Sequence, residues 1–110
     1  MEYQNVVEQL TEFGLTRQEA SIYLCLYQNG ELNGYETAKY TGISRSNVYS
    51  ALAGLVEKGA AYLIEGASSK YTAVPVQEFC VNKIRNLQEL AEKLEKNVPK
   101  AKVTTDGYIT

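Results

Sequence analysis

The sequence predicts an α+β fold, a winged helix-turn-helix domain followed by a long C-terminal helix suited to coiled-coil dimerisation. Three observations support this prediction. Two short amphipathic segments flank the tight turn Gly42-Ile43-Ser44, two β-rich segments follow them, and apolar residues recur at heptad spacing over residues 76–98. At 110 residues, the chain has room for one hydrophobic core.

The N-terminal part of the domain predicts two helices. Apolar residues recur at helical spacing over residues 5–13, and Gly14 ends this first helix. The second helix begins at Thr16, since Thr16 and Glu19 have the spacing of a capping box, in which the two side chains satisfy free backbone N–H groups. The residues expected to face the core are Val6, Leu10, Phe13, Ala20, Tyr23, Leu24 and Tyr27.

The next two helices form the predicted helix-turn-helix. Residues 35–41 carry Ala38 inward and end at Gly42, where a missing Cβ permits a left-handed turn. Ser44 is the predicted N-cap of a helix over residues 45–58. The apolar stripe of this helix consists of Val48, Ala51, Leu52 and Leu55.

A β-hairpin is expected directly after Gly59. Residues 61–64 and 71–74 are rich in β-formers, and small polar residues separate them. Pro75 closes the second strand because proline cannot donate to a β-ladder. A hairpin in this position corresponds to a wing, so residues 1–75 are expected to form one DNA-binding domain.

The C-terminal segment predicts one long helix over residues 76–98, which Pro99 ends. Its apolar residues alternate spacings of four and three, which favours pairing with another helix. The alternative is a plain amphipathic helix packed on its own domain. Residues 99–110 are interpreted as a linker or as the start of a further domain. The residues expected at a dimer interface are Cys80, Ile84, Leu87, Ala91, Leu94 and Val98.

Composition excludes several classes of function. The chain has no histidine and no CxxC pair, which excludes histidine-based hydrolytic triads and zinc fingers that use histidine. Cys25 and Cys80 are far apart among apolar residues, as expected of buried thiols in a reducing cytoplasm. No apolar run is long enough to span a bilayer. We therefore expect a cytoplasmic protein with no catalytic site, metal or cofactor.

Several motifs resemble the TrmB family of winged-helix regulators. They are residues 15–20 leading to Tyr23 and Leu24, the run from Gly42 through Leu52, residues 55–59 and residues 70–75, in matching order and spacing. The resemblance implies a transcriptional regulator, often responsive to sugars, whose winged helix binds operator DNA and whose coiled-coil helix leads to a C-terminal effector domain. This chain stops where that domain would begin, so it is interpreted as a fragment or a single-domain relative. A small-molecule effector is expected only through the missing domain.

The predicted DNA interface lies at the N-terminal end of the second helix of the helix-turn-helix, which would enter the major groove. Arginine pairs with guanine and asparagine with adenine, while hydroxyl groups contact phosphates or bases. No acidic residue occurs between Arg45 and Val56. The candidate DNA-binding residues are Lys39, Ser44, Arg45, Ser46, Asn47, Tyr49, Ser50 and Lys70.

Three alternatives stay open for these residues. The helix face could be merely solvated, Tyr49 could pack against the wing, and Lys70 could only protect the hairpin edge. Lys58 is also expected in the DNA-facing half.

The overall charge counts against nucleic-acid binding, since the net charge is −2 and the pI is near 5.2. Most of the acidic residues, however, lie in the outer and C-terminal helices. The favoured function is a dimeric, sequence-specific regulator of double-stranded DNA that binds a pseudo-palindromic operator, with half-sites ~34 Å apart. The alternative is a winged-helix module that binds another protein in a transcription-related assembly.

Overall fold

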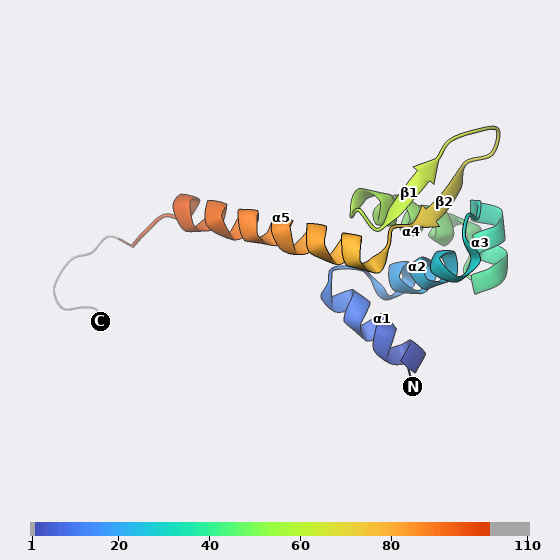
Figure 1. Cartoon of the computed structure of the whole chain (residues 1–110), viewed down its shortest axis with the longest axis horizontal. Helices are drawn as coiled ribbons and strands as arrows, with labels where there is room; N and C mark the ends of the chain where they lie inside the picture. The colour runs from blue at the N-terminus through green and yellow to red at the C-terminus, as the bar shows by residue number, and fades with distance from the viewer. Residues whose placement is uncertain (1, 102–110) are drawn as a thin grey trace.

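The computed structural model describes residues 2–101 and shows a small domain from which one long helix projects (Figure 1). The elements of the domain are α1 (Glu2–Glu12), α2 (Arg17–Asn29), α3 (Gly34–Thr41), α4 (Arg45–Glu57), β1 (Ala61–Ile64) and β2 (Lys70–Ala73). The projecting helix is α5 (Val76–Asn97). The predicted α+β fold is therefore confirmed. The interpretation of residues 102–110 lies outside the described residues.

The capping box predicted at the start of α2 is confirmed. The backbone N–H of Glu19 donates to Thr16 Oγ1 at 3.0 Å, and the backbone N–H of Thr16 donates to Glu19 Oε1 at 2.9 Å. Helix α1 begins three residues earlier than predicted, at Glu2.

The predicted core face of α1 and α2 is partly wrong. Tyr27 is half exposed, whereas Val7, Ile22 and Leu26 are buried although they lie outside the predicted stripes. Helix α2 contacts α1, α3, α4 and β2, so it is covered on more than one side. A prediction of one apolar stripe per helix underestimates how many residues of such a central helix are buried.

The helix-turn-helix has the predicted geometry. Gly42 adopts a left-handed conformation, with φ 75°, after α3. Ser44 caps α4, because its side chain accepts a hydrogen bond from the backbone N–H of Asn47 at 3.4 Å. The four apolar residues predicted for α4 are all buried. An unpredicted capping box between Asn33 and Glu36 starts α3.

Strands β1 and β2 pair antiparallel, with Ala61 opposite Ala73 and Ile64 opposite Lys70. The loop before α3 adds one isolated β-bridge to this hairpin. There Leu32 and Tyr71 exchange backbone hydrogen bonds of 3.0 and 2.8 Å. The hairpin is thereby joined to the start of the helix-turn-helix.

Helix α5 is attached to the domain at its first turns. Phe79 is buried, with its ring centroid 6.2 Å from that of Phe13 and 6.1 Å from that of Tyr23. The hydroxyl of Tyr23 donates to the Val74 carbonyl at 2.6 Å, just before the helix begins. From there α5 extends by about 33 Å, at 1.5 Å per residue, away from the domain (Figure 1). Over residues 2–101, no helix is long and apolar enough to cross a lipid bilayer.

Candidate nucleic-acid interface

The outer face of the N-terminal half of α4 is exposed. Val48 is fully buried and fixes the orientation of the helix, so the side chains on the other faces point to solvent. The exposed candidates on and before this helix are Ser44, Arg45, Ser46, Asn47, Tyr49 and Ser50. Six of the eight predicted DNA-binding residues therefore lie on one surface. Ser44 also has a structural role there as the cap of α4.

Arg45 contacts an aromatic ring on the preceding helix. Its Cζ lies 5.6 Å from the centroid of the Tyr35 ring, within the range of a cation–π interaction. Tyr35 is itself 55% exposed. Tyr35 is not among the predicted DNA-binding residues, because its contact with Arg45 depends on how α3 and α4 pack and not on spacing along the chain.

Tyr49 packs against the first turn of α3. A Cβ atom placed on Gly34 would overlap the Tyr49 ring, so the ring lies directly on the glycine backbone. The sequence predicted packing against the wing as the alternative to DNA contact and did not predict this position. About half of the Tyr49 side chain stays exposed next to Arg45.

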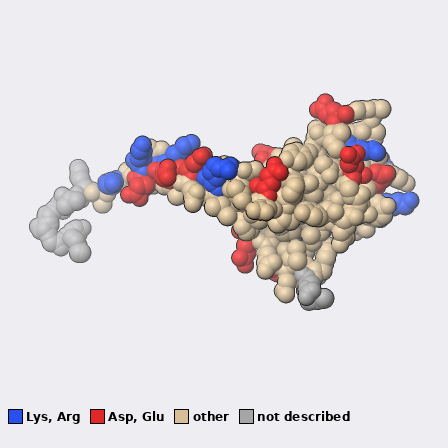
Figure 2. Space-filling view, viewed as in Figure 1, with Lys and Arg blue, Asp and Glu red and all other residues tan. Residues whose placement is uncertain are grey.

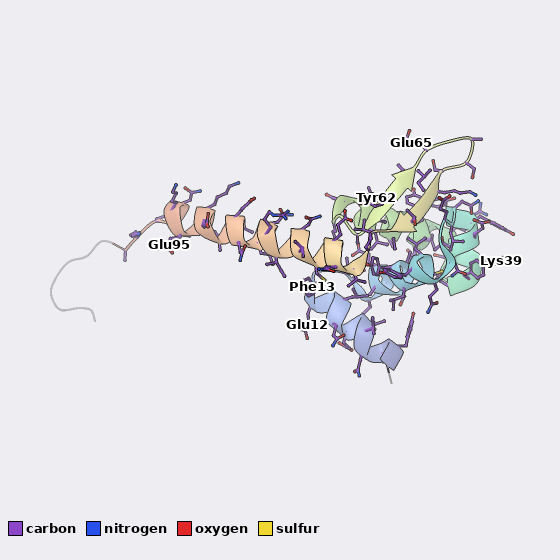
Figure 3. The ribbon with its side chains drawn as sticks, viewed as in Figure 1. Glu12, Phe13, Lys39, Tyr62, Glu65 and Glu95 are labelled. Atoms are coloured by element: carbon purple, nitrogen blue, oxygen red, sulfur yellow. The ribbon has the colours of Figure 1, made fainter. Side chains whose placement is uncertain are left out.

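The two candidate lysines lie on different elements. Lys39 is exposed in the last turn of α3 and projects from the end of the domain opposite α5 (Figure 3). Lys70 begins β2 and is half-buried, with Ile64 as its cross-strand partner. Glu65 lies near the tip of the same hairpin (Figure 3). The wing therefore carries charges of both signs.

Lys58 does not contribute a free positive charge to this surface, contrary to expectation. Its Nζ donates to Glu19 Oε1 at 2.7 Å and to the Gly14 carbonyl at 2.9 Å. The lysine follows the C-terminal end of α4, away from Arg45, and its charge is paired with a nearly buried carboxylate. Spacing along the sequence gave no indication of this pair, which joins residues 39 positions apart.

The apolar residues of α5 form an exposed stripe. Leu87 is 50% exposed, and Leu90, which the predicted set omits, is equally so. Acidic and basic side chains alternate along the rest of the helix (Figure 2). Cys80 is half-buried near the domain, while the other five predicted residues are exposed: Ile84, Leu87, Ala91, Leu94 and Val98. Packing on the domain is thus confined to the first turns of α5.

The two cysteines are free thiols. Burial raises the pKa of Cys25, which lies in the core, so this thiol is a weak nucleophile. Within residues 2–101, no group of three or more histidine, cysteine or acidic residues has a geometry that could hold a metal ion.

The fold and the exposed α4 face define a winged helix-turn-helix domain of the kind found in DNA-binding transcription regulators. The family described as "Sugar-specific transcriptional regulator TrmB" matches residues 10–77. The chain belongs to this family, whose members are transcription regulators and not enzymes.

Two proteins are similar to this chain in sequence, and a third is similar in structure. The uncharacterized protein YrhO of Bacillus subtilis is 31% identical over 94% of this chain and 38% of its own length. The sugar-sensing regulator TrmBL1 of Pyrococcus furiosus is 26% identical over 86% of this chain and 30% of its own. TrmBL2, an archaeal chromatin protein whose structure shows a novel mode of DNA binding, superposes with a TM-score of 0.80 at 32% identity. That match covers 87% of this chain and 38% of TrmBL2, so the chain spans about a third of the length of its relatives.

Proposed function

We propose that this chain is the DNA-binding part of a transcription regulator that binds a pseudo-palindromic operator as a homodimer. Residues 1–75 bind DNA and residues 76–98 pair with a second copy. One observation carries the proposal: the exposed half of α4 presents Arg45, Ser46 and Asn47 together, with no carboxylate on the helix before Glu57. Guanidinium and amide groups are the side chains that discriminate base edges in the major groove.

The exposed stripe of α5 supports the dimer. Apolar residues that recur every three and four positions on an unpaired helix favour burial against a second helix of the same pattern. A two-fold dimer would present two copies of α4 to successive major grooves, about 34 Å apart. The expected operator is therefore two inverted half-sites about one helical turn apart.

The test is selection from random DNA duplexes by the purified chain at two salt concentrations. We expect enrichment of a two-fold symmetric motif and weaker binding at the higher salt, because phosphate contacts release counterions. Arg45→Ala is the matched variant and should weaken binding to the selected motif by about 1–3 kcal/mol. Failure to enrich any duplex at low salt would contradict the proposal.

A protein-binding module is the second candidate, and the hairpin favours it. Tyr62, Leu63 and Ile64 are all exposed on β1, which forms the edge of the sheet. Such a run of apolar side chains is suited to contact with another protein. The salt titration separates the two functions, since an apolar contact weakens little with salt.

A further inference from the structure

Two consecutive residues at the start of α3 contact two residues one turn apart on α4. Tyr35 lies under the Arg45 guanidinium, with 5.6 Å between Cζ and the ring centroid. Gly34 lies under the Tyr49 ring, so closely that any larger residue at position 34 would displace that ring. The first turn of α3 thus contacts both large side chains at the centre of the proposed DNA-binding face.

This first turn is held from both sides. Its capping box joins the Glu36 N–H to Asn33 Oδ1 at 2.7 Å and the Asn33 N–H to Glu36 Oε1 at 2.9 Å. Immediately before it, Leu32 is hydrogen-bonded to Tyr71 of β2. Gly34 itself is buried. The Tyr35 ring therefore extends from a part of the backbone that the wing and the cap both fix.

The cation–π contact with the Tyr35 ring restricts where the Arg45 guanidinium can lie. The guanidinium carries several N–H donors, and two of them can pair with N7 and O6 of guanine while the cation stays over the Tyr35 ring. Among residues 2–101, Arg45 has no ion-pair partner within 4.0 Å. Restricting a long side chain before binding also reduces the conformational entropy lost on binding.

We infer that Tyr35 is a positioning residue that holds Arg45 in place to contact one guanine in each half-site. The inference rests on the proposed function and adds to it a specificity-determining contact that starts on the neighbouring helix. The aromatic ring, and not the phenolic hydroxyl, carries the effect.

The experiment compares Tyr35→Ala, Tyr35→Phe and Arg45→Ala on the selected duplex and on duplexes in which single G·C pairs are replaced. Replacing the guanine that Arg45 contacts should weaken binding by the wild type but not by Arg45→Ala. On the selected duplex, Tyr35→Ala should lose roughly three- to tenfold in affinity, as expected for one cation–π contact and one mobilised side chain. On the duplex without that guanine, Tyr35→Ala should bind with the same affinity as the wild type. Tyr35→Phe should bind the selected duplex like the wild type.

Two results would overturn the inference. If Tyr35→Phe loses as much as Tyr35→Ala, the hydroxyl contacts DNA directly and the ring has no positioning role. If Tyr35→Ala loses the same affinity on both duplexes, or loses none on either, the contact of Arg45 with guanine does not depend on the ring. Tyr35 is more than half exposed, so equal thermal stability of the variants is expected and serves as the folding control. If the wild type selects no duplex, the proposed function itself fails, which is a different outcome.

Discussion

Replacement of Gly54 by alanine should destabilise the protein, although glycine within a helix is ordinarily a weak point. Alanine in the interior of α4 would contribute roughly 0.5–1 kcal/mol through helix propensity. A Cβ at this position, however, would overlap Oε2 of Glu19. The Glu19 carboxylate must then move.

The cost of that movement follows from the bonds of the carboxylate. Glu19 is 7% exposed, and its Oε1 accepts from both Thr16 N and Lys58 Nζ. Loss of the capping interaction costs about 1 kcal/mol. Loss of the ion pair adds about 1 kcal/mol, a figure reduced because the Lys58 side chain is 34% exposed. The sum exceeds the propensity gain, so Gly54→Ala should lose about 1 kcal/mol.

Urea denaturation followed by circular dichroism would measure this effect as a double-mutant cycle. In a Glu19→Ala background the overlap disappears, and Gly54→Ala should instead stabilise by roughly 0.5–1 kcal/mol. The neighbouring exposed position provides the control, since Ala53→Gly should destabilise by a similar amount through propensity alone. If Gly54→Ala stabilises the protein in the wild-type background, the buried Glu19 carboxylate does not constrain this helix.

Two further substitutions test the helix α5 and its junction with the domain. Leu87→Glu should dissociate the proposed dimer by placing an unpaired charge in the interface. Gln88→Glu adds the same charge at the adjacent exposed position and should leave the dimer intact. Identical sedimentation of Leu87→Glu and wild type would refute pairing through α5. Tyr23→Phe removes the only hydroxyl bonded to the Val74 carbonyl among the described residues and should lower the free energy of unfolding by about 1–2 kcal/mol, while an unchanged urea midpoint would show that this buried bond contributes nothing.

The predictable part of the structure is the part with local signals. The cap at Thr16, the left-handed Gly42 and the cap at Ser44 each depend on residues within four positions of one another. The capping box of Asn33 and Glu36 has the same local form and could have been found by the same argument. The heptad pattern of α5 likewise predicted one long helix.

The contacts that escaped prediction join separate elements. Arg45 meets Tyr35, Tyr49 meets Gly34, and Lys58 meets Glu19 across helices whose crossing the sequence does not reveal. Each of these contacts changes what a side chain can do. Lys58 was expected in the DNA-facing half, and its charge is instead paired with Glu19.

The strength of salt dependence follows from this revised set of charges. With Lys58 paired, and with Arg45 assigned to a base in the proposed complex, Lys39 and Lys70 are the remaining predicted residues whose positive charge could contact phosphate in each protomer of the proposed dimer. Two protomers then make about four such contacts, so a plot of log K against log salt concentration should have a slope of about −3.6. Fluorescence anisotropy on the selected duplex would measure it, and Lys39→Ala should reduce the slope by about two, one for each protomer. A slope near zero would exclude phosphate contact by these lysines. A slope near −8 would require further phosphate contacts, made by positively charged residues outside this face.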